Sequence, residues 1–314
     1  ERTAGEPDRG SARRVERTRL LAAGPAHRPQ AVAGWRAAAR RAAERLAFTE
    51  SAALCRRALE AFGAGPGAEP AERCALLLQA AAATLRAGDI DRGHALCHEA
   101  FQLARALEDA RLMAQAALTY GSAFAVGKVD PDLLRLLRDA LAALDARPGR
   151  AGDAADAGLR ARLQGRLAAA LQPAADPAEP IAMARQAVAL ARSTGDRRAL
   201  FETLTSAISA LMDFAPAAEH LELSREYAAL AEEFNDVPAQ FRAHTVLFID
   251  GLELADPQLM EAAMAHCERL ARRIDLPHYQ WRVHSARALQ AVIHGDLDAA
   301  AQRLQRAQEA AAQA

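Results

Sequence analysis

Residues 121–129 (GSAFAVGKV) come closest in this sequence to a nucleotide-binding motif. A P-loop has the pattern G-x-x-x-x-G-K-[ST] after a strand, because its backbone N–H groups surround the phosphates and its hydroxyl reaches Mg²⁺. Here five residues separate Gly121 from Gly127, Val129 replaces the hydroxyl residue, and the flanking sequence is helical in pattern. The segment therefore does not predict phosphate binding, and Gly121 is expected at a close contact between helices.

A second group with possible chemistry is the H-x-x-C-H cluster of His94, Cys97 and His98. Structural zinc requires four ligands, usually in two spaced pairs, and no second pair is present. Cys97, like Cys55, falls at an inward position of a helix, where a small buried thiol packs well. We therefore predict no metal and no cofactor. No Ser/His/Asp arrangement stands out either, so the chain is not expected to be an enzyme.

The composition favours packed helices. The chain has 314 residues, of which 51% are hydrophobic and only 4% aromatic, and alanine supplies much of the hydrophobic fraction. Alanine has the highest helix propensity and lets helices approach closely. The net charge of −1 argues against direct nucleic-acid binding, which usually shows as a basic patch.

The sequence also suggests a compartment and a source. The longest uncharged run, residues 112–127, is too short and too polar to span a bilayer. No signal peptide is visible, and the four cysteines lie far apart, so we expect reduced thiols and a cytoplasmic location. Lys128 is the only lysine, which indicates a GC-rich bacterial genome. The first residue is Glu1, so the chain is expected to be a fragment.

Helical segments recur along the chain at intervals of about forty residues. Each contains an alanine at an equivalent position, and the intervals between these alanines are 42, 40, 47, 41, 43 and 36 residues. The matched alanines are Ala58, Ala100, Ala140, Ala187, Ala228, Ala271 and Ala307. Seven units of this length predict an all-α solenoid of about seven helical hairpins.

Turn residues mark the two helices of each unit. In the second unit, Gly88-Asp89 separates a helix over about residues 71–87 from one over about 91–107. Glycine tolerates positive φ at a helix end, and the aspartate caps the next helix. The same role is predicted for Gly195-Asp196, Asn235-Asp236 and Gly295-Asp296, which recur between later helices. Aspartate followed by proline at 130, 176 and 256 also marks a helix start.

Gly/Pro/Asp-rich stretches divide the chain. Residues 1–12 are predicted to be disordered, and residues 145–158 to form a loop or hinge. This loop would separate an N-terminal sub-stack over 13–144 from a C-terminal sub-stack over 159–314.

Aligned on its alanines, the chain resembles tetratricopeptide repeats, with Trp35, Phe48 and Ala58 in register in the first unit. Segments 44–60, 191–200, 221–236 and 275–300 further resemble the helical region of bacterial STAND and AAA-type ATPase regulators, which often carry LuxR-type or nucleotide-cyclase domains. The third unit departs from the pattern because it lacks a Gly-Asp turn.

The resemblance implies a non-catalytic scaffold whose partner is a protein segment or its own upstream ATPase module. The alternative is a sensor that takes a small-molecule effector in the concave face. In this repeat the first helix of each unit lines that face. The positions carried over are Arg36, Arg40, Gln115, Ser122, Thr203, Ser206, Arg282 and Ser285. Ordinary solvated surface remains the other interpretation of each. The sequence does not identify the partner, the effector or the oligomeric state.

Overall fold

The computed structural model describes residues 28–63, 69–123, 129–146, 154–172, 176–212 and 214–313. These residues form helices and turns without a strand. The described part of the chain also contains no helix with the length and apolar character needed to cross a membrane. The all-α class predicted from the sequence is confirmed.

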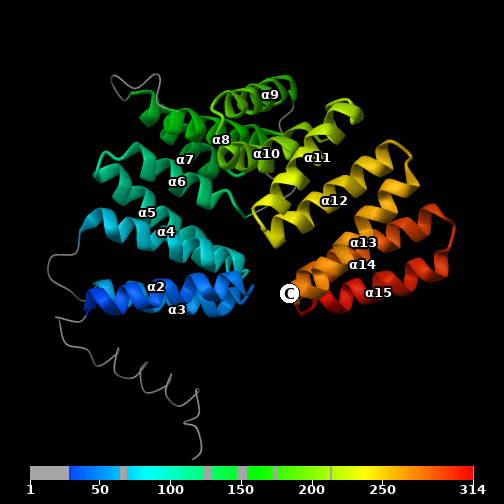
Figure 1. The fold of residues 1–314 in the computed structure, drawn as a ribbon, viewed down its shortest axis with the longest axis horizontal. Helices are drawn as coiled ribbons and strands as arrows, with labels where there is room; N and C mark the ends of the chain where they lie inside the picture. Colours follow the sequence, from blue (N-terminus) through cyan, green and yellow to red (C-terminus); the bar gives the residue numbers. More distant parts are fainter. Residues whose placement is uncertain are drawn as a thin grey trace, which may run out of the picture. The chain divides into compact units, whose positions relative to one another are not determined.

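Two compact units divide the chain, residues 1–148 (unit 1) and 149–314 (unit 2). The described helices of unit 1 pair as three hairpins, α2/α3, α4/α5 and α6/α7 (Figure 1). Their bounds are α2 (Arg28–Glu44), α3 (Phe48–Gly63), α4 (Pro70–Arg86), α5 (Ile90–Ala106), α6 (Ala110–Tyr120) and α7 (Pro131–Asp145).

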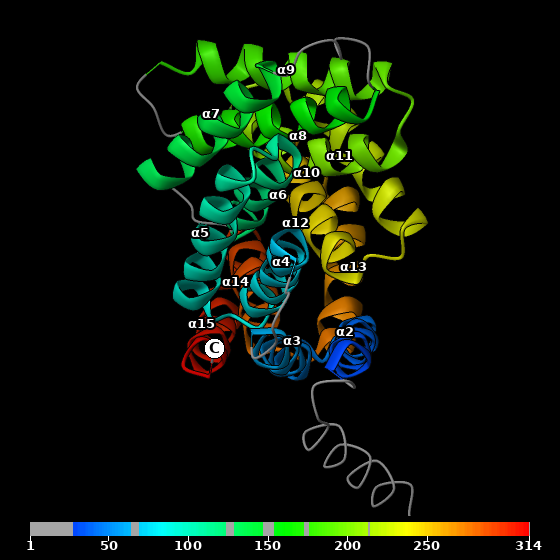
Figure 2. The same ribbon diagram turned by 90° about the vertical axis from the view of Figure 1, so that its left-hand side faces the viewer.

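Unit 2 contains four hairpins among its described residues, and Figure 2 shows the same helices from the side. Their bounds are α8 (Ala154–Leu171), α9 (Ala178–Ser193), α10 (Arg197–Leu211), α11 (Ala217–Glu233), α12 (Val237–Glu253), α13 (Pro257–Ile274), α14 (Pro277–Ile293) and α15 (Leu297–Ala311). We call α8, α10, α12 and α14 the first helices of unit 2, and α9, α11, α13 and α15 its second helices.

A repeated two-residue signal starts many of these helices. A residue in the left-handed conformation is followed by an aspartate whose carboxylate accepts backbone N–H groups of the first turn. Gly88-Asp89, Gly195-Asp196, Asn235-Asp236 and Gly295-Asp296 do this as predicted. Glu108-Asp109 and Ala255-Asp256 use the same geometry without glycine, which is why the sequence pattern did not reveal their left-handed residue.

Two of the predicted boundaries differ from the structure. Residues 154–158 belong to α8, so the irregular segment predicted over 145–158 is shorter than expected at its C-terminal end. Asp176 accepts from the Ala178 N–H, but Pro177 lies before α9 instead of inside its first turn. The predicted disordered segment 1–12 lies outside the described residues.

The matched alanines lie on the second helix of each hairpin, and six of the seven are buried. Ala228 is the exception, because α11 buries its neighbour Tyr227 and Ser224 instead. Tyr227 stacks on Phe201 of α10 with ring centroids 5.5 Å apart. The alignment by small residues was therefore one position off in this hairpin, where an aromatic ring fills the space between helices.

Candidate functional site

The predicted site residues are divided between the two units. Arg36, Arg40, Gln115 and Ser122 belong to unit 1. Thr203, Ser206, Arg282 and Ser285 belong to unit 2.

In unit 1, Arg36 connects two hairpins. Its Nε donates to Oε1 of Gln79 at 3.0 Å, and the Gln79 amide donates back to the Arg36 carbonyl at 3.5 Å. This contact joins α2 to α4, which are the first helices of neighbouring hairpins. Arg40, one turn further along α2, is exposed. Arg40 can therefore meet a partner directly, while Arg36 already holds two helices together.

Gln115 is exposed on α6, but Ser122 is not on a first helix. Ser122 follows Gly121, the residue that ends α6, and its hydroxyl donates to the Thr119 carbonyl at 2.7 Å. Its role is to satisfy a carbonyl at the helix end. The prediction that Ser122 lies on a first helix is therefore wrong, because α6 ends at Tyr120.

Thr203 is also not a surface residue. Its side chain is 0% exposed, and its hydroxyl donates to the Ala199 carbonyl one turn earlier in α10. Gly165 of α8 lies opposite: a Cβ placed there would be 3.3 Å from the Thr203 methyl group. Gly158 and Gly165 let α8 approach α10 closely, and Thr203 is therefore buried between these two helices.

Ser206, Arg282 and Ser285 are partly exposed on first helices of unit 2. Arg282 belongs to a larger pattern that the sequence interpretation did not use. Arg162, Glu202, Arg242 and Arg282 follow one another at intervals of forty residues, one on each first helix. All four are partly buried. We call this set the forty-residue file.

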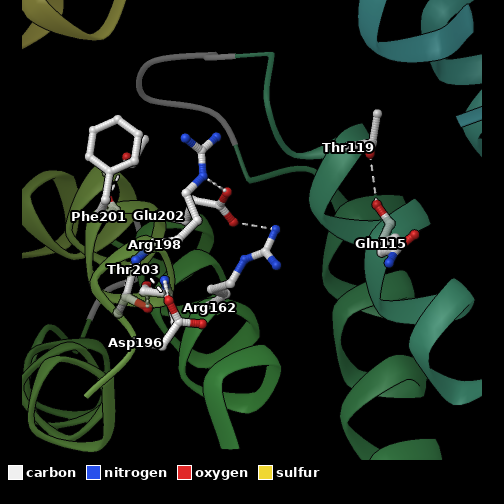
Figure 3. A network of polar contacts seen from close by, with 10 residues as sticks. Gln115, Thr119, Arg162, Asp196, Arg198, Phe201, Glu202 and Thr203 are labelled. Carbon is white, nitrogen blue, oxygen red and sulfur yellow. Dashed lines mark hydrogen bonds and ion pairs between the residues drawn. The ribbon is translucent and has the colours of Figure 1, made fainter. Parts of the chain in front are cut away.

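Ion pairs organise the beginning of the file. Arg162 of α8 reaches the Glu202 carboxylate at 2.5 Å, and Arg198 of α10 reaches its other oxygen at 2.6 Å. Figure 3 shows both guanidinium groups converging on Glu202. Arg198 also lies over the rings of Phe201 and Phe234, 5.3 and 5.1 Å from their centroids. Glu202 is thus neutralised within unit 2.

The end of the file consists of two arginines on neighbouring first helices. Arg242 of α12 donates to the Ser209 hydroxyl of α10 at 2.9 Å. Burial lowers the pKa of Arg242, and the nearby charge of Arg282 lowers it further. Both side chains remain cations, since arginine does not lose its proton in proteins. Two positive charges therefore lie close together on neighbouring first helices.

The second helices show a different arrangement of charge. Arg185 and Arg192 of α9 pair with Glu219 and Glu226 of α11 at 2.8 and 2.5 Å. These exposed pairs balance their own charges and add little stability.

A buried ion pair ties three helices of unit 2 together. His220 of α11 is 2% exposed and Asp250 of α12 is 0% exposed, and the His220 Nδ1 contacts the Asp250 carboxylate. The other ring nitrogen, Nε2, lies 3.0 Å from the Ile208 carbonyl of α10. A carbonyl only accepts, so Nε2 carries a proton. When Asp250 is ionised, Nδ1 donates to its carboxylate, and His220 is then an imidazolium.

The environment of His220 raises its pKa. Burial alone lowers this pKa, but the hydrogen bond and charge of Asp250 outweigh the burial. The second Asp250 oxygen, Oδ2, is buried without a hydrogen-bond partner among the described residues. This pair was missed because its members lie thirty residues apart, and nothing in the sequence distinguishes them from solvated residues.

The H-x-x-C-H cluster is used for packing. His94 stacks on Tyr120 with ring centroids 3.8 Å apart, and His98 meets the same ring edge-on at 5.2 Å. Cys97 is fully buried, and burial raises the pKa of its thiol to about 12. The described residues contain no group of three or more His, Cys, Asp or Glu side chains able to hold a metal.

Comparisons with known proteins identify the fold of this chain through solved structures. No protein-family model matches the sequence, and no curated protein matches it. The solved structure of the apo form of RapI has 12% identity and a TM-score of 0.56, over 90% of this chain and 98% of that one. A Rap protein complexed with Competence and Sporulation Factor has 14% identity and a TM-score of 0.63, over 89% of this chain and 76% of that one.

A STAND protein with a tetratricopeptide-repeat sensor from Pyrococcus horikoshii has 12% identity and a TM-score of 0.49, over 94% of this chain and 44% of that one. The two Rap structures establish the architecture. The chain has a tetratricopeptide-like fold. Its described helices therefore form a helical-repeat solenoid, and the predicted fold class is confirmed.

Proposed function

We propose that this chain is a non-catalytic regulatory scaffold that binds a protein segment along the first helices of its repeats. The observation that carries the proposal is the forty-residue file, which places partly buried charged side chains on four consecutive first helices. The second helices α9 and α11 instead pair charges with each other. Partly buried charge on four consecutive repeats is suited to recognising a long partner, because one segment can contact several repeats.

The Rap structure complexed with Competence and Sporulation Factor supports a binding role for this fold. The resemblance of segments 221–236 and 275–300 to bacterial ATPase regulators supports a place within such a signalling protein. The protein segment would then be a separate partner or part of the ATPase module.

Selection of random linear peptides on the immobilised chain tests this function. Hydrogen–deuterium exchange of the chain with a selected peptide should show protection on first helices, including α10, α12 and α14, and little change on α9, α11 and α13. Protection confined to the second helices, or no selected peptide at all, would reject the scaffold function. Binding of a small metabolite but of no peptide would favour the sensor alternative.

A charge reversal in unit 1 gives a second test. Arg40→Glu should weaken binding of a partner that spans unit 1, while the free energy of unfolding stays within about 0.5 kcal/mol of the wild type. Arg40 is exposed, so the change leaves the Arg36–Gln79 contact in place. The matched control is Arg138→Glu on α7, an exposed position of a second helix, which should leave binding unchanged. Equal losses in both variants would indicate a general charge effect.

A further inference from the structure

The last hairpin of unit 2, α14/α15, exposes an unusual amount of apolar surface. More than half of the exposed large hydrophobic side chains in the described part of the chain belong to this one hairpin: Trp281, Leu289, Val292, Ile293, Leu297 and Leu304. The outermost hairpins of repeat proteins need a polar outer face to stay soluble. An apolar outer face on α14/α15 therefore indicates an interaction surface.

The forty-residue interval shows what the exposed position on α14 does in an earlier hairpin. Trp281 of α14 corresponds to Phe241 of α12. Phe241 is 1% exposed, and its ring meets the ring of Tyr279 edge-on with centroids 4.8 Å apart. Tyr279 belongs to α14, which is the first helix of the following hairpin. The Trp281 ring is 41% exposed, so the described residues do not cover it in the same way.

The second helices give the same result. Leu304 of α15 corresponds to Met264 of α13, yet Leu304 is 50% exposed and Met264 only 1%. Ala307, three residues later, stays buried in α15, as its counterpart Cys267 does in α13. Burial of Ala307 therefore comes from its own hairpin. Burial of Met264 instead requires the following hairpin, whose first helix α14 contacts α13.

We propose that the outer face of α14/α15 binds an amphipathic helix of a partner protein, which packs there as the first helix of a following hairpin would. We call this face the terminal face and define it by Trp281, Leu289, Val292, Leu297 and Leu304. The contact that α14 makes with α12 and α13 continues in register onto the terminal face. The partner helix would carry an aromatic side chain near its start, to cover Trp281 as Tyr279 covers Phe241, and a stripe of apolar residues three or four positions apart.

A partner helix fits the terminal face better than a second copy of the chain or a lipid surface. Within unit 2, the second helix α13 packs on the first helix α14, so the two contacting faces differ. A symmetric contact between two copies would instead place the terminal face against itself. Helices that lie on membranes are usually rich in Lys and Arg on their polar face, whereas Asp296 and Asp298 flank Leu297 at the start of α15.

A display library of helical peptides based on residues 277–293 tests this inference. The apolar positions of this α14 sequence are varied among Ala, Leu, Phe, Tyr and Trp, and binders are selected on the immobilised full chain. Selected peptides should keep an aromatic residue near their start, and hydrogen–deuterium exchange should show protection of α14 and α15. For the tightest peptide, Leu304→Lys should weaken binding by at least about 10-fold, because it places a cation in an apolar contact.

Leu254→Lys is the matched control. Leu254 is also an exposed leucine of unit 2, but it lies at the end of α12, outside the terminal face. This variant should bind the peptide like the wild type. Failure to select any helix, unchanged binding to Leu304→Lys, or equal losses in both variants would overturn the partner-helix site. Alanine in place of the peptide's own aromatic residue should weaken binding to the wild-type chain by a similar factor, which keeps the test decisive even if Leu304→Lys fails to fold.

Two further measurements examine the other occupants. A dimer seen by sedimentation velocity and abolished by Leu304→Lys would assign the terminal face to a second copy of the chain. Binding to phosphatidylserine vesicles that is lost in the same variant would assign it to a lipid surface. Either result would overturn the partner helix. The terminal face goes beyond the proposed scaffold function, and its failure would leave peptide protection of α10 and α12 untouched.

Discussion

Asp250→Ala is expected to lower the free energy of unfolding of unit 2 by about 3–5 kcal/mol at neutral pH. Removing the carboxylate leaves the His220 ring buried at 2% exposure, with one nitrogen still on the Ile208 carbonyl and the other without its acceptor. The contact also joins α11 to α12, so its loss weakens the packing between two hairpins. Urea denaturation followed by circular dichroism measures the change.

The dependence on pH should reverse in this variant. In the wild type, the His220 pKa is raised above its unfolded value of about 6.5. The His220–Asp250 pair therefore contributes its full stabilisation below about pH 6.5. This stabilisation decreases as the pH rises through the pKa of His220 in the folded protein. Without Asp250, burial dominates and lowers the His220 pKa, so stability should instead fall as the pH drops below about 6.5.

Two further variants check the assignment to charge. Asp250→Asn keeps the size of the side chain, so it should lose less stability than Asp250→Ala but show the same reversed pH trend. Glu253→Gln removes an exposed carboxylate on the same helix whose charge makes the smallest contribution to the raised His220 pKa, so its pH trend should keep the wild-type direction. An Asp250→Ala profile parallel to that of the wild type would show that His220 is not the imidazolium inferred from its contacts.

Trp35→Ala is expected to cost about 3–5 kcal/mol, as large truncations in a packed core do. The Trp35 ring is 6% exposed and packs in a cluster that includes Leu54, Ala58 and Leu76 from α3 and α4. The Arg57 guanidinium lies 5.4 Å from the ring centroid and covers it from α3. Loss of the Trp35 ring opens a cavity between α2, α3 and α4.

Trp281→Ala is the matched control, because this ring is 41% exposed. Its effect should stay below about 1 kcal/mol. A Trp281→Phe background leaves Trp35 as the single tryptophan, whose fluorescence then follows unit 1 alone during urea unfolding. Similar losses for both tryptophans would mean that burial of Trp35 is not what stabilises the first hairpin.

The fold was predictable because its signals are local. Aspartate caps, helix-ending residues such as Gly88 and buried alanines such as Ala58 and Ala100 act within one hairpin. Helices α4 and α5 consequently begin and end within about one residue of the predicted positions. Ala228 shows the limit of this reasoning, since the large Tyr227 ring beside it determines which residue faces the core.

The candidate site was only partly predictable, because it depends on contacts between hairpins. Arg282 and Ser285 were placed correctly on a first helix, whereas Thr203 was covered by close packing against Gly165. Whether Arg36 faces solvent or Gln79 depends on the register of α2 against α4, which composition does not determine. The charged first-helix positions of unit 2 are forty residues apart in the sequence. The repeats were aligned on alanines of the second helices, and that alignment did not compare the charged positions of the first helices.

The four cysteines provide a way to observe opening of individual helices. Cys55, Cys74 and Cys97 lie in α3, α4 and α5 of unit 1, and Cys267 lies in α13 of unit 2. Burial raises the pKa of Cys55, Cys74 and Cys267 to about 11. Because alkylating reagents react with the thiolate, a folded molecule at neutral pH exposes almost none of the reactive form. The rate at which iodoacetamide modifies each site, read by mass spectrometry, therefore reports how often its hairpin opens in the native protein.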